Sequence, residues 1–221
     1  MACLDFVSFL HNRTQRDYVA RVVEHDKAES AAIAKQFGRD YWDGERRYGY
    51  GGYSYDGRWR PVAERMAEHY GLEAGHRILD VGCGKGYLLY EFSQILPGIE
   101  VVGLDVSRYA IDNAKEEVRP YLEVGGADSL PFDDGSFDFV VSLGTLHNLR
   151  LPALVAAVRE IERVGKAGRS YIMVESYRDE REKANLLYWQ LTCEAFFDTE
   201  EWAWLLEREG YSGDHGFIFF T

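Results

Sequence analysis

A glycine-rich turn between an apolar run and a helix-like run is the feature that most constrains the fold of this chain. The segment Ile-Leu-Asp-Val-Gly-Cys-Gly-Lys-Gly-Tyr occupies residues 78–87. Its apolar start is typical of a buried strand, and glycine lets the following backbone approach a ligand because no Cβ atom intervenes. A helix that begins directly after the turn directs free N–H groups to the same place. The segment therefore predicts a strand, a ligand-binding turn and a helix in an α/β fold.

Short apolar runs alternate with helix-like stretches from residue 76 onward, which is the order expected of a parallel sheet with crossover helices. The expected strands are residues 77–81, 100–104, 122–126, 137–142, 170–175 and 217–220. The expected helices are residues 87–96, 108–119, 152–164 and 199–209, the last with Asp198 as its N-cap. We therefore expect a doubly wound, Rossmann-like, mostly parallel α/β sheet with helices on both faces.

The first 70 residues differ from this pattern. They contain a helix-like stretch at 18–36, an irregular stretch rich in Tyr and Gly, and a second helix from Pro61. With 221 residues, the chain suits one domain with an elaboration better than two domains. We expect residues 1–70 to form a cap on a main domain of residues 71–221.

Charge and cysteine content narrow the possible partners. Lys and Arg number 25 against 37 Asp and Glu, a net charge of −12, which opposes binding of nucleic acid. The three cysteines, Cys3, Cys83 and Cys193, form neither a disulfide framework nor a zinc motif. No targeting segment or membrane span is apparent. We expect a cytoplasmic monomer or homodimer that acts on a small molecule and binds no nucleic acid, membrane or metal.

The spacing of the glycines restricts the kind of ligand that the turn can bind. It is G-x-G-x-G, and Tyr87 stands where the dinucleotide fingerprint needs its third glycine; no G-K-[ST] follows. Asp105 directly follows the next expected strand, about 20 residues on, where an acid suits ribose hydroxyls. Asp128 and Ser129 follow the third strand on the same sheet edge.

With these motifs in register, the chain resembles the class I S-adenosylmethionine-dependent methyltransferases, especially the small-molecule branch similar to the ubiquinone-biosynthesis enzymes. The resemblance covers about residues 71–220 and implies S-adenosylmethionine as the cofactor. By position, it implies that the turn contacts the methionine part, Asp105 the ribose, and Asp128 with Ser129 the adenine. The implied cofactor-binding set is Asp80, Gly82, Gly84, Gly86, Asp105, Val106, Asp128, Ser129 and Leu143. One departure is that a seventh, antiparallel strand is missing after residues 217–220, so we expect a trimmed or differently built sheet edge.

Two residues are candidates for acid–base chemistry. Methyl transfer is an in-line displacement that needs a well-placed nucleophile and little water, and a base mainly for a hydroxyl acceptor. His147 follows the fourth strand, in the loop that resembles the one beneath the reactive methyl group, and imidazole suits neutral pH. It could instead pack against the cofactor or bond to backbone. Glu175 ends the fifth strand and is a second base, a substrate anchor, or a carboxylate bonded to loop amides.

Residues 40–59 are dense in aromatics and glycines, which suits a lid that closes over a substrate. The alternative is an aromatic cluster that only covers the sheet. The expected substrate contacts are Tyr41, Tyr50, Tyr53, Arg58 and Trp59 from this stretch and Tyr177 after the fifth strand. Residues 186–197 form a second aromatic stretch, whose helical spacing favours core packing for Trp189 and Phe196.

The leading hypothesis is methyl transfer to an oxygen or nitrogen of a small polar metabolite. Two alternatives stay open. One is methyl transfer to carbon in cell-surface or secondary metabolism. The other is a non-catalytic partner subunit that binds the same cofactor.

Overall fold

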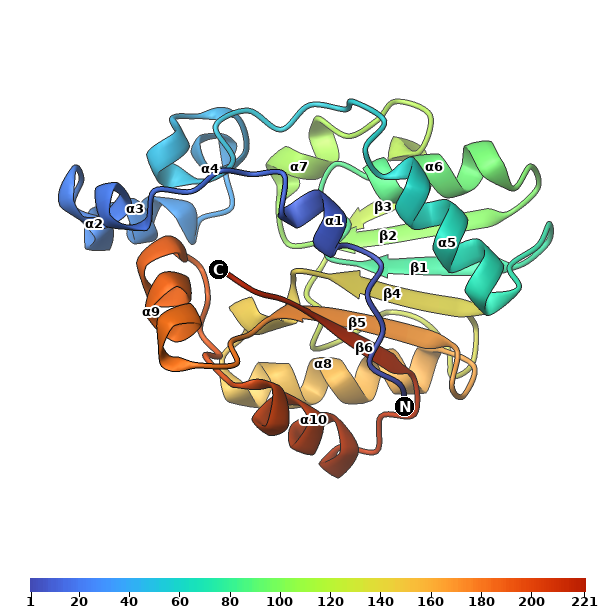
Figure 1. Cartoon of the computed structure of the whole chain (residues 1–221). Helices are drawn as coiled ribbons and strands as arrows, with labels where there is room; N and C mark the ends of the chain where they lie inside the picture. Colours follow the sequence, from blue (N-terminus) through green and yellow to red (C-terminus); the bar gives the residue numbers. More distant parts are fainter.

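Six parallel strands form one sheet at the centre of the molecule in the computed structural model, which describes all residues 1–221 (Figure 1). They are β1 Arg77–Val81, β2 Glu100–Asp105, β3 Leu122–Val124, β4 Phe139–Leu143, β5 Ser170–Glu175 and β6 Asp214–Ile218. Their order is β3-β2-β1-β4-β5-β6, and every neighbouring pair is parallel. The order reverses between β1 and β4, the place where open α/β sheets bind ligands. The predicted doubly wound fold is confirmed.

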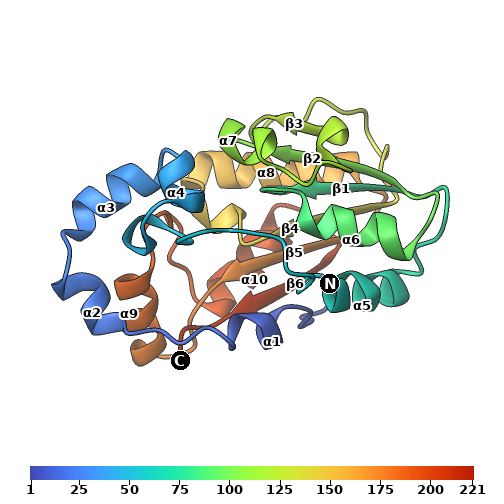
Figure 2. The same ribbon diagram turned by 90° about the horizontal axis from the view of Figure 1, so that it is seen from above.

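Helices cover both faces of the sheet (Figures 1 and 2). They are α1 Ser8–His11, α2 Tyr18–Val23, α3 Lys27–Ala34, α4 Arg39–Asp43, α5 Arg60–Tyr70, α6 Tyr87–Ile95, α7 Arg108–Asp112, α8 Leu151–Val164, α9 Glu180–Trp189 and α10 Thr199–Arg208. Short 3-10 turns lie at Arg46–Tyr48, Arg119–Tyr121 and Leu146–Asn148. One core joins α5 and α6 to the face that carries Phe139 and Val141. The other joins α8 and α10 to the face that carries Val140 and Ile172.

Side-chain alternation along the strands divides the core in this way, because successive residues point to opposite faces. The N-cap prediction for α10 is also confirmed: Asp198 accepts from the backbone of Glu200 and Glu201, and Glu201 bonds back to the Asp198 N–H. This capping box fixes where the last helix begins.

Three predicted elements differ from the structure by more than two residues. The stretch 18–36 is two helices, because Asp26 caps a new start by accepting from the N–H groups of Ala28 and Glu29. Helix α7 ends at Asp112, since the Lys115 N–H bonds to the Lys85 carbonyl of the glycine turn. The last strand lies at Asp214–Ile218, a few residues before its predicted place, in register with β5.

The far edge of the sheet is built from the N-terminal residues. Cys3 pairs in parallel with His215 of β6; the Leu4 N–H donates to the His215 carbonyl at 2.7 Å. Tyr171 of β5 adds a bond from its hydroxyl to the Leu4 carbonyl at 2.8 Å. An exposed strand edge offers unpaired backbone groups to other chains, and this segment covers part of it. The edge is therefore differently built, which is one of the two outcomes that the sequence analysis expected.

From this edge the chain crosses the sheet to the carboxyl ends of the strands. There α2, α3 and α4 lie together, away from β4 and β5 (Figures 1 and 2). Helix α2 packs beside α9. None of the helices combines the length and apolarity needed to cross a bilayer.

Candidate active site

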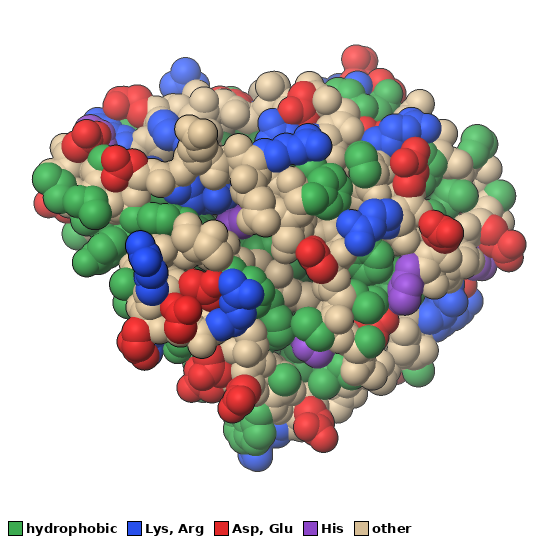
Figure 3. Space-filling view, in the orientation of Figure 1, with side chains coloured by type: hydrophobic (Ala, Val, Ile, Leu, Met, Phe, Trp, Pro, Cys, Tyr) green, Lys and Arg blue, Asp and Glu red, His purple; other side chains and the backbone are tan.

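A cavity of about 460 Å³ opens at the carboxyl ends of the central strands. Its size lies in the range of small-molecule sites, roughly 300 to 1,000 Å³. Figure 3 shows a recess on the left of this face, between the N-terminal helices above and the α9 region below. The predicted residues that line the cavity are Asp80, Gly82, Gly84, Leu143, His147, Glu175, Tyr41, Tyr50, Tyr53, Arg58 and Trp59. The fold thus brings the predicted residues at the ends of the strands and those of the aromatic stretch 40–59 to one site.

The glycine turn after β1 has a conformation that requires glycine. Gly82 has φ +86°, and a Cβ atom there would lie 1.9 Å from the Thr145 hydroxyl oxygen. Gly84 also has positive φ, and its N–H donates to the Asp105 carboxylate at 2.8 Å. The Ser107 N–H donates to the other Asp105 oxygen at 2.8 Å. Asp105 therefore ties the glycine turn to the end of β2, and its burial raises the pKa of its carboxyl group.

Six predicted site residues lie outside the cavity lining. They are Gly86, Asp105, Val106, Asp128, Ser129 and Tyr177. A Cβ atom at Gly86 would come within 2.9 Å of Val118 and Leu122, so this glycine serves the packing of α6. Val106, Asp128 and Ser129 are exposed, and their cofactor-binding role stays a prediction. Tyr177 packs with Leu186 and Phe220 in a small core, so the structure gives its predicted substrate contact no support.

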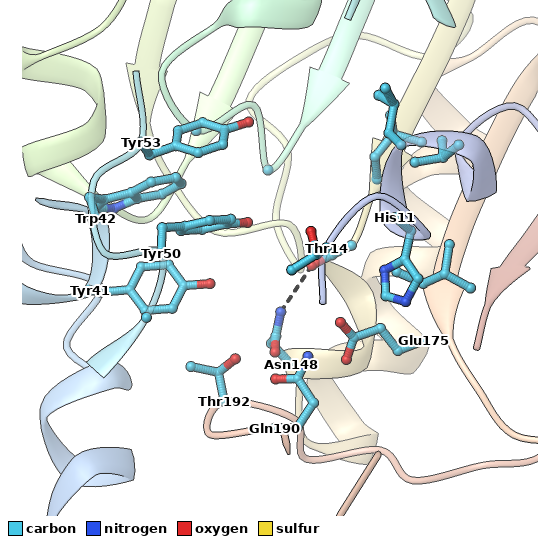
Figure 4. A pocket seen from close by; sticks show the side chains of 18 of the residues that line it. His11, Thr14, Tyr41, Trp42, Tyr50, Tyr53, Asn148, Glu175, Gln190 and Thr192 are labelled. Atoms are coloured by element: carbon cyan, nitrogen blue, oxygen red, sulfur yellow. Dashed lines mark hydrogen bonds between the residues drawn. The ribbon is translucent and has the colours of Figure 1, made fainter. Parts of the chain in front are cut away.

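Aromatic rings form one wall of the cavity (Figure 4). Trp42 stacks on Tyr50 with ring centres 5.3 Å apart and planes at 10°; Tyr53 follows at 4.5 Å from Tyr50. Trp42 also lies on the glycine turn, because a Cβ atom at Gly84 would be 2.8 Å from its Cη2 atom. Its indole N–H donates to the Ser107 hydroxyl at 2.8 Å. We call Tyr41, Trp42, Tyr50 and Tyr53 the aromatic wall.

A buried lysine fastens this wall to the glycine turn. Lys85 stands between Gly84 and Gly86, and its side chain is 6% exposed. Its ammonium group donates to both Asp43 oxygens, at 2.9 and 2.7 Å, and to the Tyr53 carbonyl at 2.7 Å. The positions of the turn and of the aromatic wall are therefore coupled.

His147 and Glu175 meet at the opposite side. The Glu175 N–H donates to Nδ1 of His147 at 3.3 Å, which assigns the proton of the neutral ring to Nε2. Nε2 lies 3.3 Å from Oε2 of Glu175, but the two groups form no hydrogen bond. The ring is 2% exposed, and burial lowers the pKa of His147 to about 3. His147 is therefore neutral near pH 7, with its Nδ1 lone pair already engaged.

Glu175 has the opposite shift. Burial raises the pKa of its carboxyl group to about 8, although Gln190 and the positive charge of Arg16 act against the rise. Its Oε2 atom is buried without a hydrogen-bond partner. In Figure 4 the carboxylate points into the cavity, toward the side on which the hydroxyls of Tyr41 and Tyr50 project. Of the two predicted catalytic residues, Glu175 is the one able to exchange a proton near neutral pH.

Several polar lining residues have no counterpart in the predicted set. Asn148 donates to the Gly144 carbonyl at 3.1 Å, which leaves its buried Oδ1 atom without a partner. His11, Thr14, Gln190 and Thr192 lie around the same space (Figure 4). Asn148 follows His147 directly and could have been found from that motif. The other four lie in segments with no motif, and only the tertiary fold brings them here.

The strand order, the glycine turn after β1 and the acid after β2 together define a Rossmann-like methyltransferase fold. Residues 79–173 match the family model described as a methyltransferase domain. An uncharacterized methyltransferase from Synechocystis is 33% identical over 142 residues, which cover 63% of this chain and 64% of that protein. Demethylmenaquinone methyltransferase from Symbiobacterium thermophilum is 31% identical over 128 residues, 54% of this chain and 50% of that protein.

A solved structure shows the same fold. The YcgJ protein from Bacillus subtilis matches with a TM-score of 0.57 and 24% identity, covering 66% of each chain. This chain spans 64% of the length of the Synechocystis relative and 50% of the length of the Symbiobacterium relative. Residues 79–173 form a class I S-adenosylmethionine-dependent methyltransferase domain, similar to the ubiquinone and menaquinone branch, and S-adenosylmethionine is its cofactor.

Proposed function

We propose that this protein transfers a methyl group to an oxygen or nitrogen of a small polar metabolite. The observation that carries the proposal is Glu175, a buried carboxylate with a raised pKa and an unpartnered oxygen, on the same cavity as the glycine turn. On this proposal residues 1–70 act as a cap, and residues 71–221 as the cofactor-binding domain. The net charge of −12 favours a small molecule over nucleic acid as the acceptor.

The residues at β1, β2 and β4 fit the cofactor. Gly82 and Gly84 expose backbone at positive φ to the cavity, and Asp80 and Leu143 line it beside them. These four would hold the methionine part, and Asp105 the ribose. When bound, S-adenosylmethionine supplies an electrophilic methyl group on a sulfonium centre.

Glu175 then removes the proton that an O–H or N–H acceptor must lose. A carboxylate within hydrogen-bond reach of that proton is a suitable base, and a pKa near the working pH favours the transfer. His147 acts as a positioning residue, since it holds the Glu175 backbone through Nδ1. The aromatic wall excludes water, which would otherwise compete for the carboxylate and the acceptor.

A quinone ring is a second candidate acceptor. The relative from Symbiobacterium thermophilum is named for demethylmenaquinone, and it is 31% identical over its matched part. The stacked rings of Trp42 and Tyr50 suit a flat ring as well as a polar metabolite. Such an acceptor would take the methyl group at carbon.

The proposal is tested by calorimetric titration with S-adenosylmethionine, S-adenosylhomocysteine and NAD. We expect both sulfur compounds to bind in the micromolar range and NAD not to bind. Release of S-adenosylhomocysteine is then followed with panels of hydroxyl, amine and quinone acceptors. Binding without turnover on any panel would favour the non-catalytic alternative, and no binding to folded protein would contradict the proposal.

A further inference from the structure

Three arginines gather around one indole ring in the cavity wall. The guanidinium carbons of Arg21, Arg46 and Arg16 lie 4.8, 5.2 and 5.4 Å from the ring centre of Trp189. All four residues line the cavity. The helical spacing of residues 186–197 predicted core packing for Trp189. The ring does pack against the small core that contains Leu186 and Phe220, and it also lies where α9 ends and meets the cavity.

None of these three arginines has a carboxylate partner within ion-pair distance. Arg58, the fourth arginine of the lining, does: it pairs with Asp56 at 2.6 Å. The predicted substrate contact at Arg58 therefore involves a charge that is already neutralised. The charge left free in the cavity belongs to arginines that the sequence analysis did not select.

Backbone carbonyls hold the three guanidinium groups in place. Arg16 donates to the His11 and Thr14 carbonyls, and Arg21 to those of Trp189 and Arg46. Arg46 donates to the Gly49 carbonyl. These bonds orient the side chains without pairing any of them with a carboxylate. The Nε atom of Arg16 is buried without any partner.

Such a cluster is electrostatically unfavourable in the free protein. Burial, and then the charge of Arg46, lower the pKa of Arg21 to about 10, so the ordered groups repel each other and stay charged at neutral pH. The chain as a whole carries −12, and Figure 3 shows acidic and basic side chains interspersed over this face. An anion placed among the arginines would relieve the repulsion and fill their free donors.

The sheet topology places this cluster on the acceptor side. The glycine turn follows β1, whereas α9 and Trp189 follow β5, two strands away in the order β1-β4-β5. Neighbouring strands are ~4.8 Å apart, so the two regions begin roughly 10 Å from each other. Glu175 ends β5, and its carboxylate is near enough to Arg16 for their charges to interact.

We propose that the methyl acceptor is an anion whose carboxylate or phosphate group binds Arg16, Arg21 and Arg46 at Trp189 while its nucleophile reaches Glu175. This inference rests on the proposed function and adds the substrate class to it. The cofactor also carries a carboxylate, and the experiment must separate these two sources of negative charge.

The test is calorimetric titration of benzoate, phenyl phosphate and neutral benzamide, with and without saturating S-adenosylhomocysteine. We expect at least one of the anions to bind roughly tenfold more tightly than benzamide. Raising KCl from ~50 to ~500 mM should weaken the anion and leave benzamide unchanged, because salt screens the charge. Equal binding of benzoate, phenyl phosphate and benzamide, or no anion binding at all, would overturn the proposal.

Variants locate the site. Arg21→Gln and Arg46→Gln should each weaken anion binding roughly tenfold. Arg13→Gln is the matched control, since Arg13 is exposed, lies in the same N-terminal region and is outside the cavity. If a variant does not fold, the salt dependence of the unaltered protein still decides whether an anion site exists.

Whether the arginines bind the cofactor carboxylate instead is tested with S-adenosylhomocysteine and with 5′-methylthioadenosine, which lacks the amino-acid part. We expect Arg21→Gln to change neither affinity. If it weakens only S-adenosylhomocysteine, the arginines bind the cofactor carboxylate and the acceptor assignment is wrong. If S-adenosylhomocysteine does not bind the unaltered protein, the proposed function fails, and the titrations without it still decide on the anion site.

Discussion

The ammonium group of Lys85, inside the glycine turn, contacts both carboxylate oxygens of Asp43, in the segment that carries the aromatic wall. The Tyr109 hydroxyl donates to the same carboxylate at 2.9 Å, from α7 after β2. One acid thus joins the turn after β1, the helix after β2 and the aromatic wall. Any movement of the wall away from the turn has to break or carry along this ion pair.

Asp43→Ala should loosen the aromatic wall. The change leaves the buried Lys85 ammonium with a single carbonyl partner, and we expect the free energy of unfolding to fall by about 1 to 3 kcal/mol. Urea unfolding measures the loss, and hydrogen exchange over residues 40–59 measures the loosening. Asp56→Ala is the control, since its partner Arg58 is about half exposed and such pairs contribute about 0 to 1 kcal/mol. Equal effects of the two changes would mean that the Lys85 contact does not hold the wall.

Glu175→Gln should lower turnover by about 10²- to 10⁴-fold, because the amide cannot accept the proton of the acceptor. Its affinity for S-adenosylhomocysteine, measured by calorimetry, should stay the same. His147→Gln should have a smaller effect and keep the pH dependence due to Glu175. A larger loss in His147→Gln, together with a changed pH profile, would make His147 the base.

Stability should fall as pH rises through about 8. The pKa of Glu175 rises from 4.5 to about 8 on burial, so the folded state binds a proton that the unfolded state has released. Its stabilising contribution is complete below pH 4.5 and is lost as pH passes about 8. Glu175→Gln should therefore gain stability relative to the unaltered protein between pH ~6 and ~9, as measured by thermal unfolding.

Asp80 adds to the same pH dependence. Burial, and then the charge of Asp105, raise the pKa of Asp80 to about 8. The stability of Glu175→Gln should therefore still fall as pH rises, and this dependence should become weaker when Asp80→Asn is added. Parallel curves for the unaltered protein and both variants would show that these carboxyl groups are not protonated in the folded state.

Asp105→Asn should weaken binding of S-adenosylhomocysteine by about 1 to 3 kcal/mol, since an amide cannot accept from both the backbone and the ribose hydroxyls as a carboxylate does. Calorimetry measures the change. Asp112→Asn, an exposed position on α7, provides the control and should leave affinity unaltered. Unchanged affinity in Asp105→Asn would remove Asp105 from the cofactor site.

Gly82→Ala and Gly144→Ala separate backbone strain from steric clash. Both glycines have positive φ, at which alanine costs about 1 to 2 kcal/mol. A Cβ atom at Gly144 meets nothing within 4 Å, whereas one at Gly82 would overlap Thr145. Gly82→Ala should therefore destabilise the protein by at least about 2 kcal/mol more than Gly144→Ala does, as judged from urea midpoints. Equal losses would mean that the turn can move away from Thr145.

The sequence predicted what depends on local pattern and strand order. The glycine turn and Asp105 lie where predicted because a strand, a turn and a helix are specified by neighbouring residues. The state of His147 could not be predicted, since its burial depends on strands and loops far along the chain. The arginine cluster was missed for the same reason: Arg21 reaches Trp189 through the packing of α2 beside α9, and Arg16 and Arg46 come from other parts of the N-terminal region.

The lining of the cavity comes from two kinds of segment. Its base comes from the ends of the strands, whereas its sides come from residues 7–21, 41–59 and 189–192, which belong to no strand. Substitutions in those three stretches alter no strand of the sheet, provided that the contacts of Trp42 and Asp43 with the glycine turn are kept. Evolution can therefore exchange one acceptor for another in this architecture by rebuilding the sides alone, while the chemistry at the base is inherited unchanged.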